Sequence, residues 1–592
     1  MKPTLLDRAA HIVLLALTVA GSRPALAEQP MGVSPALTRW VDPLPIPPVA
    51  APRTKPGISG WADYYEITMT QHAHRFHSEL GPATVWTYGI PGQVGIYAGP
   101  TIVARRNRPV VVKWLNQLPN DPSTFPLKDA LDPTLMGADL PTGRAVPHLH
   151  GGHTAARFDG TPDQWWTSDG QKGMAFVSDT YVYANDQPAT LLWYHDHAMG
   201  QTRLNPYLGL AAAYLLFDEV DNGRTIHGQP VPTGAYHLPL VLQDKTFNPD
   251  GSLFYPTEGV SPVHPIWVPE FFGDTPVVNG KAYPRLDAEP RRYRLRLLNG
   301  SQARFYDLAF NLEGAPLPFH VIGSEGGLLP APVQTTHLLI APGERFDLIV
   351  DFTGLPMGSQ VTLANAAPAP YPGGGMTELP ELMRISIDVP VSASDPDLSV
   401  PASSLRLPAI PKLQPTPKLA EREVVLQEYA DPSDNPTGVL LNGYHYMDPV
   451  TDFVKAGTTE TWAWINLTGD AHPMHTHLVS FEVIGRQPFD AAGYETAWNA
   501  YLDSGRQAAL KPSLAAFLTG PVLPPDPEER GRKDTVKAYP GFVTRIRARF
   551  DLPWTSALDL DLRRRSFGNW VYHCHILEHE ENDMMRPLEI IF

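Results

Sequence analysis

Short segments in which apolar and polar residues alternate recur along this chain, with turns rich in Pro, Gly and Asp between them. Tyr65–Met69 and Val110–Trp114 are two examples. Successive side chains of a strand point to opposite faces, so a period of two indicates half-buried β-strands. Many short strands with turn residues between them are typical of β-sandwiches. The pattern therefore predicts an all-β fold.

A weak internal repeat divides the chain. Three strand-like runs end on asparagine, at Asn116, Asn299 and Asn466, and these asparagines lie 183 and 167 positions apart. This spacing suits three related β-sandwich domains. Five prolines between Pro401 and Pro417 indicate an extended linker before the third domain. We place the domains at 35–225, 226–395 and 419–592, with the Pro-rich linker at 396–418.

Composition supports the all-β prediction and excludes some classes of binding partner. The 592 residues include 64 prolines, which long helices tolerate badly. The formal net charge of −16 argues against nucleic acid as a partner. No apolar stretch after the N-terminus reaches the ~18 residues that suggest a membrane span.

The N-terminus resembles an export signal. Lys2 and Arg8 precede an apolar run, and Ala25–Ala27 provides a small-residue cleavage site. We expect residues 1–27 to be a signal peptide and the protein to be exported, either to the periplasm or as a secreted protein. The single cysteine, Cys574, excludes an intramolecular disulfide.

Paired histidines are the strongest chemical signal. Residues two apart in a strand share a face, so each His-X-His presents two imidazoles side by side. One such pair is weak evidence, and we read His72 and His74, which have no partner motif, as a surface stretch. Four further pairs supply eight imidazoles, more than one zinc site needs. These pairs are His148 and His150, His195 and His197, His475 and His477, and His573 and His575.

The residue inside the fourth pair points to copper. If His573 and His575 share a face, Cys574 points to the opposite one. His472 stands three residues before His475, so it also turns away from its pair. His472, Cys574 and His579 then form a trigonal site of two imidazoles and one thiolate, with Met584 as a weak axial ligand. This donor set is typical of blue-copper electron-transfer sites.

With these motifs the sequence resembles the multicopper oxidases, within them the three-domain bacterial group of laccases, bilirubin oxidases and phenoxazinone synthase. The matching strings are His148–Gly151, Trp193–Met199, His472–His477 and His573–Glu580, with further similarity in Gly99–Thr101, Ala341–Asp347 and Lys533–Thr535. The resemblance covers most of the mature chain, and it implies that each domain is a cupredoxin-like Greek-key β-sandwich.

The resemblance also implies four copper ions: one type 1, one type 2 and a type 3 pair. His148 and His475 would hold the type 2 copper. The type 3 pair would be held by His150, His195, His197, His477, His573 and His575. Asp159 and Glu580 match acidic positions that pass protons to the cluster. A turn residue before glycine for Asp159, and a partner of a ligand histidine for Glu580, are the competing interpretations.

The implied activity is oxidation of phenols, aromatic amines or bilirubin-like donors at the type 1 copper, coupled to four-electron reduction of dioxygen to water. Oxidation of metal ions such as Cu(I) or Mn(II) is the alternative. The methionines are scattered rather than clustered as soft ligands for Cu(I), which favours a small aromatic donor. A non-enzymatic electron-transfer protein would leave eight histidines unexplained.

Overall fold

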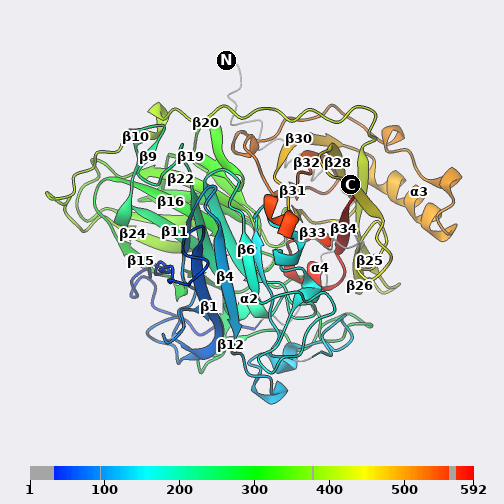
Figure 1. Ribbon diagram of the computed structural model, residues 1–592, viewed down its shortest axis with the longest axis horizontal. Coiled ribbons are helices and arrows are strands. Elements are labelled where there is room, and N and C mark those ends of the chain that lie inside the picture. The colour runs from blue at the N-terminus through cyan, green and yellow to red at the C-terminus, as the bar shows by residue number, and fades with distance from the viewer. Residues whose placement is uncertain (1–31, 94, 141, 376–378, 559–568, 592) are drawn as a thin grey trace.

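The computed structural model describes residues 32–93, 95–140, 142–375, 379–558 and 569–591 (Figure 1). The predicted signal peptide, residues 1–27, lies outside the described residues. The strands form three β-sandwiches in chain order, each built from two sheets. The predicted all-β fold of three sandwiches is therefore confirmed.

The first sandwich pairs two four-stranded sheets. The order of the first sheet is β2 (Ala83–Gly89), β1 (Asp63–His74), β4 (Val110–Asn116) and β6 (Thr180–Tyr183). The order of the second is β3 (Ile102–Arg105), β8 (Ala211–Phe217), β7 (Thr190–Asp196) and β5 (Pro147–His150). Every residue of β5 and β7 is buried, so these two strands lie in the interior of the molecule.

The second sandwich is the largest. Its eight-stranded sheet has the order β14 (Lys281–Ala282), β13 (Thr275–Val278), β11 (His237–Phe247), β16 (Arg292–Asn299), β22 (Arg345–Asp351), β19 (Phe319–Ser324) and β20 (Gly327–Thr335), with β12 (Leu253–Phe254) beside β11. Its six-stranded sheet has the order β15 (Arg285–Asp287), β24 (Glu381–Ser386), β23 (Gln360–Asn365), β17 (Tyr306–Leu312) and β18 (Ala315–Leu317), with β21 (Leu338–Ile340) beside β17.

The third sandwich pairs two five-stranded sheets. The first has the order β26 (Pro436–Leu441), β25 (Arg422–Ala430), β28 (Thr459–Asn466), β32 (Phe542–Arg549) and β30 (Phe481–Pro488). The second has the order β27 (Asp452–Lys455), β34 (Met585–Ile591), β33 (Asn569–Cys574), β29 (His472–Thr476) and β31 (Thr535–Ala538). A small ribbon of β9 (Thr225–Ile226) and β10 (Gln229–Pro230) and the helices α2 (Asn205–Leu208), α3 (Ala491–Asp503) and α4 (Leu577–Glu581) lie in the connections.

The predicted repeat is present in the backbone. In each sandwich a parallel strand pair, β1 with β4, β11 with β16 or β25 with β28, includes the asparagine at its end. Each asparagine donates its side-chain amide to two backbone carbonyls and accepts from the N–H two residues later. An asparagine therefore stabilises the equivalent strand end in all three sandwiches, because its amide hydrogen-bonds backbone groups that lack a partner in the sheet.

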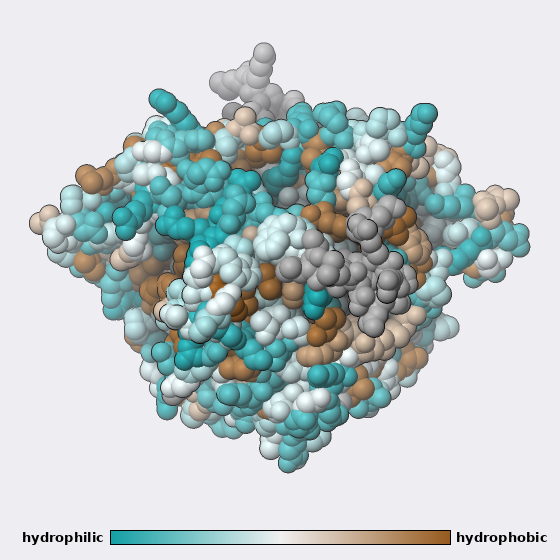
Figure 2. All heavy atoms as spheres, in the orientation of Figure 1, coloured by the Kyte–Doolittle hydropathy of each residue, from teal (hydrophilic) through white to brown (hydrophobic). Residues whose placement is uncertain are grey.

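The first and third sandwiches are in contact, although they lie at opposite ends of the chain. Figure 1 shows the cyan region around β6 and α2 beside β33 and α4 in red. A yellow-green segment crosses the top of that view, where the predicted linker connects the second sandwich to the third. The surface in Figure 2 mixes hydrophilic and hydrophobic residues. No helix among the described residues is long and apolar enough to cross a bilayer.

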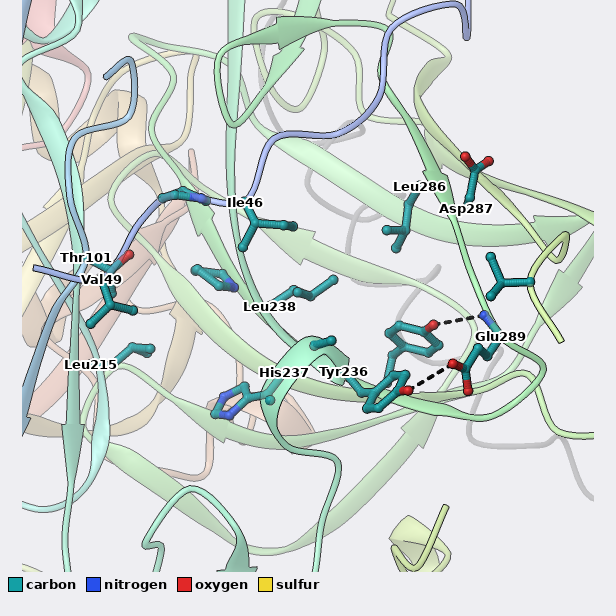
Figure 3. Close-up of a pocket in the computed structure, with 16 residues that line it drawn as sticks. Ile46, Val49, Thr101, Leu215, Tyr236, His237, Leu238, Leu286, Asp287 and Glu289 are labelled. Atoms are coloured by element: carbon teal, nitrogen blue, oxygen red, sulfur yellow. Dashed lines mark hydrogen bonds between the residues drawn. The ribbon is translucent and has the colours of Figure 1, made fainter. Parts of the chain in front are cut away.

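A cavity of about 500 Å³ lies between the first and second sandwiches (Figure 3). Apolar residues such as Ile46, Leu215 and Leu238 line it, and at one end Tyr236 donates its hydroxyl to the Glu289 carboxylate. None of the fourteen predicted site residues lines this cavity. The chemistry of the chain is therefore found elsewhere.

Candidate metal centre

The four histidine pairs converge at the contact between the first and third sandwiches. His148 and His195 face each other across β5 and β7, and His475 and His573 face each other across β29 and β33. The second histidine of each pair comes two residues later, in the same strand or in the turn after it, and points to the same side as the first. All eight side chains are at most 1% exposed. The alternation of strand side chains is thus what gathers eight imidazoles in one interior space.

Within this space the ring nitrogens form groups that are compact enough to bind a metal ion. In each group the donor atoms lie within 4.8 Å of one another. Two groups that share no residue each contain three histidines from both sandwiches: His150, His195 and His575, and His197, His477 and His573. A further group joins His148, His150 and His475. Among the described residues, no such group contains His72 or His74. Both side chains are half-buried, and His74 Nε2 lies 2.8 Å from the carbonyl oxygen of Gly280 in the second sandwich.

Hydrogen bonds fix which nitrogen of each ring remains available. The Nδ1–H groups of His148, His195 and His475 donate to the backbone carbonyls of Asp159, Asp196 and Asp534 at 2.6, 3.0 and 2.8 Å. The Nε2 atoms of the same three rings are buried and unpartnered. A donor bond from one ring nitrogen fixes the tautomer and leaves the lone pair of the other for a metal. Buried unpaired nitrogens that face one another fit metal ions.

The donor chemistry fits copper. Neutral imidazole is a ligand that copper accepts, and burial keeps these rings neutral. Desolvation lowers the pKa of His195 to about 3 and holds the pKa of His148 and His475 well below the usual range. The rings therefore retain their lone pairs at any ordinary pH.

Asp159 and Glu580 contact the histidine cluster on two sides. Asp159 accepts a 2.6 Å bond from His477 Nδ1 and a 2.7 Å bond from the Thr154 hydroxyl. The Glu580 carboxylate oxygens lie 3.3 Å from His197 Nδ1 and 3.0 Å from His573 Nδ1. Burial raises the pKa of Asp159 to about 8. Both carboxyl groups can position a ring, and the raised pKa of Asp159 lets that group hold a proton beside the cluster.

A second cluster lies within the third sandwich. Cys574 Sγ lies 3.5 Å from His472 Nδ1 and 3.9 Å from His579 Nδ1, and the two histidine nitrogens are 3.3 Å apart. His472 Nε2 is 2.7 Å from the hydroxyl of Thr468, so its Nδ1 faces the sulfur. This is the soft trigonal donor set that suits copper.

Met584 lies next to this cluster in the backbone. Its N–H donates to the carbonyl of His579 at 2.9 Å, and its carbonyl accepts from the N–H of Cys574 at 3.0 Å. The side chain is fully buried. The turn after α4 therefore holds Met584 against both neighbouring residues of the cluster.

Sequence reasoning assigned no role to several residues that contact these clusters. Thr468 orients His472, and Asp534 accepts a 3.1 Å bond from His150 Nε2. Arg345 in turn donates two hydrogen bonds to Asp534. Charged residues inside otherwise buried strand segments, as in Lys533–Thr535, are the signal that points to such partners.

Known proteins match this chain over most of its length. Residues 416–591 match the family described as multicopper oxidase. A laccase of Bacillus subtilis (strain 168) is 39% identical over 567 residues, covering 94% of this chain and 99% of its own. Multicopper oxidase LPR1 of Arabidopsis thaliana is 37% identical over 89% of this chain and 88% of its own.

Solved structures match the fold. The 2F4 variant of the McoA multicopper oxidase from Aquifex aeolicus superimposes with a TM-score of 0.69 at 24% identity, over 93% of this chain and all of that one. The three sandwiches are therefore of the cupredoxin type, as expected. Taken with the identity to curated relatives, these matches establish that the chain belongs to the multicopper oxidase family.

Proposed function

We propose that this oxidase couples one-electron oxidation of small aromatic donors to the four-electron reduction of dioxygen to water. Family membership establishes a laccase-type oxidase that uses copper, dioxygen and a reducing substrate. The non-enzymatic alternative is therefore set aside. The proposal adds the donor class, four copper ions of three types and the roles of individual residues.

The proposed ligands follow the observed groups. His472, Cys574, His579 and Met584 would hold the type 1 copper, and His148 and His475 the type 2 copper. The remaining six histidines would hold the type 3 pair, three for each ion, and the two trios that share no residue support this division. Copper supplies one-electron redox chemistry and dioxygen binding when it is present.

The position of Cys574 carries the proposal. Its sulfur belongs to the group of His472, Cys574 and His579. Its neighbours in the chain, His573 and His575, belong to the cluster of eight histidines. The backbone of three consecutive residues therefore links an electron-accepting site to an oxygen-reducing site.

We propose that Asp159 and Glu580 deliver the protons that water formation requires. Each contacts two ligand candidates, and each is buried within the cluster wall. A carboxyl group within hydrogen-bond reach can transfer a proton to a reacting oxygen, directly or through one water. Asp159, with its raised pKa of about 8, is able to carry a proton at neutral pH.

Aromatic side chains near His472 support an organic donor. Ala471 donates its N–H to the carbonyl of Tyr371, whose ring stacks on Phe305 with centroids 5.1 Å apart. Tyr371 is partly exposed. Its backbone adjoins Ala471, the residue before His472, so it provides an aromatic surface near one of the two type 1 histidines, His472 and His579, through which an electron would enter.

Acidic groups near His472 favour a second candidate, oxidation of metal cations. Glu428 Oε1 lies 3.7 Å from His472 Nε2. Glu270 is 6% exposed, and its Oε2 has no hydrogen-bond partner. Burial together with the charges of Asp470 and Glu428 raises the pKa of Glu270. A metal cation bound beside these acids would displace the proton of Glu270 and stabilise the carboxylate, so the acidic groups can bind a cationic donor.

Copper quantitation followed by oxygen uptake tests the proposal. We expect four coppers per chain and oxygen uptake with a neutral phenol or an aromatic amine above that with Mn(II) or Cu(I). Oxygen uptake with metal ions alone would support the second candidate. A chain that binds only one copper and consumes no oxygen would contradict both candidates.

The same preparation tests export. We propose that residues 1–27 direct export of the chain, to the periplasm or as a secreted protein, on the basis of the basic, apolar and small-residue segments described above. N-terminal sequencing of the mature protein should begin close to Glu28, and an intact Met1 would contradict this.

A further inference from the structure

Two sequence motifs, Ala341–Asp347 and Lys533–Thr535, have no role in the function proposed so far. The first belongs to the second sandwich, which carries none of the four paired-histidine motifs of the cluster. The second immediately precedes and enters β31 of the third sandwich. In the structure the two motifs contact each other at the edge of the histidine cluster.

Arg345 connects all three sandwiches through one guanidinium group. It lies at the start of β22 in the second sandwich and is 1% exposed. Its NH1 and NH2 groups donate to Asp534 Oδ1 and Oδ2 at 2.7 and 2.5 Å. Its Nε donates to the carbonyl of Leu191 on β7 of the first sandwich at 3.2 Å. A bidentate pair of this kind fixes the orientation of a carboxylate as well as its position.

Asp534 transmits this position to two ligand candidates. Its Oδ1 accepts from His150 Nε2 at 3.1 Å, which leaves the buried and unpartnered Nδ1 of that ring for a metal. Its backbone carbonyl accepts from His475 Nδ1 at 2.8 Å, which leaves Nε2. One residue therefore sets the tautomer of a histidine from the first sandwich and of one from the third.

The backbone of the first motif also packs on the rings. Gly343 has a φ of +80°, and a Cβ at this position would lie 2.9 Å from the ring of His575 and 3.2 Å from His150. Gly151, with a φ of +81°, approaches the Arg345–Asp534 pair in the same way, since a Cβ there would lie 2.4 Å from each. Only glycine allows both the positive φ and the close approach.

A buried network of opposite charges continues from this pair. Lys533 bridges Glu325 and Glu344 at 2.8 and 2.9 Å, and Lys537 bridges Glu344 and Glu529 at 3.1 and 3.2 Å. Arg486 closes the network on Glu529 at 2.6 Å. Glu325 and Glu344 belong to the second sandwich. The network therefore fixes the second sandwich against the third, because a buried charge that loses its partner is strongly destabilising.

We propose that Arg345 and Asp534 are positioning residues for the copper cluster, so that the second sandwich sets the orientation of His150 and His475. The proposal rests on the proposed function, because it concerns the same histidines. Partners of metal-bound histidine typically change metal affinity by about 10–100-fold when they are mutated. The effect should fall on the type 2 copper and its type 3 neighbour, and not on the type 1 copper.

A copper-retention assay on the full-length holoenzyme tests this. Wild type and Asp534→Asn are titrated with a chelator while electron paramagnetic resonance follows the type 2 signal and visible absorption follows the type 1 site. We expect Asp534→Asn to lose type 2 copper at about 10–100-fold lower chelator concentration. We also expect its type 2 hyperfine splitting to change at unaltered type 1 absorbance. Identical chelator midpoints and splitting in the two proteins would overturn the proposal.

Arg294→Gln is the matched control. Arg294 is as buried as Arg345 and makes bidentate contacts with Asp347 and Asp221 inside the second sandwich and its border with the first. It should leave the ratio of type 2 to type 1 copper unchanged. An equal loss of type 2 copper in this variant would contradict a positioning role, because general destabilisation would then explain both.

Thr535→Val serves if Asp534→Asn does not fold. The Thr535 hydroxyl lies 3.2 Å from His150 Nε2 and 3.3 Å from His475 Nδ1, and valine preserves its shape. A shift of the type 2 midpoint in the same direction supports the proposal, and an unchanged midpoint overturns it. Wild-type protein that shows neither a type 1 nor a type 2 signal would instead refute the proposed function.

Discussion

The two clusters both use buried histidines, but they draw them from the chain in different ways. His472, Cys574 and His579 all belong to the third sandwich, within about 110 residues of chain. The eight histidines come in equal numbers from the first sandwich and the third. The site of His472, Cys574 and His579 therefore forms when the third sandwich folds. The cluster of eight histidines forms only when the first and third sandwiches dock.

The carboxylates around the histidine cluster follow from this difference. Asp159 of the first sandwich contacts His477 of the third, while Asp534 of the third contacts His150 of the first. Glu580 of the third contacts His197 of the first. Each acid thus spans the interface, so the residues that orient the ligands also hold the two sandwiches together.

Cys574→Ser should have the largest effect, and it should affect one cluster and not the other. Serine offers no soft thiolate, so the type 1 copper and its blue colour should be lost and turnover should fall to background. The histidine cluster does not use the sulfur and should keep its type 2 signal. Absorption and electron paramagnetic resonance spectra with copper counts check this. A blue and active variant would refute the assignment of Cys574.

Asp159→Asn should affect only the cluster that spans the interface. Loss of a positioned acid or base typically costs about 10²–10⁴-fold, so reoxidation of the reduced enzyme by dioxygen should slow by that order. Reduction of the type 1 site by the donor should not change. Stopped-flow measurement of the two half-reactions decides, and equal slowing of both would assign Asp159 a purely structural role.

The stability of the metal-free protein should fall as the pH drops from 7 towards 4. Burial lowers the pKa of His195 and His472 to about 3 and holds the pKa of His148 and His475 well below the usual range. Unfolded histidine binds protons near pH 6.5. Between these values each of these histidines binds more protons in the unfolded state than in the native state, so the histidines lower the free energy of unfolding in acid. Buried carboxyls with a raised pKa, such as Asp159, contribute in the opposite direction, and we expect the more numerous histidines to dominate.

Thermal unfolding across this pH range checks the sign of the effect. The copper-loaded protein should show a higher Tm, because metal binds the folded state. Removing copper with a chelator at pH 7 should lower Tm. A metal-free protein whose Tm stays constant or rises between pH 7 and 4 would contradict the neutral buried imidazoles.

Met584→Leu should have the smallest effect. An axial thioether tunes a blue-copper site without being essential to it, so the variant should remain blue and active with an altered reduction potential. Redox titration followed at the type 1 absorption measures the change. An unchanged potential, with unchanged kinetics, would place the axial ligand elsewhere.

The sequence predicted the clusters because strand geometry is local. Alternation alone implied that Cys574 points away from His573 and His575, and the structure places its sulfur next to His472 as expected. The repeat of Asn116, Asn299 and Asn466 likewise marks equivalent strand ends in three sandwiches. Both inferences depend on residues within one strand.

The contacts between sandwiches could not be predicted in this way. Arg345 and Asp534 are separated by 189 positions, and no periodicity relates them. The role of Thr468 was missed because the turn between β28 and β29, which strand alternation does not describe, brings its hydroxyl to His472. The acidic groups at Glu270 and Glu428 come from different sandwiches, so their effect on donor charge emerges only from the folded chain.

Anomalous diffraction at the copper edge from crystals of the copper-loaded protein tests the central claim most directly. The account predicts one copper bound by His472, Cys574 and His579, and three coppers enclosed by the eight histidines of the first and third sandwiches. Copper bound elsewhere, or a Cys574 sulfur without copper, would contradict it.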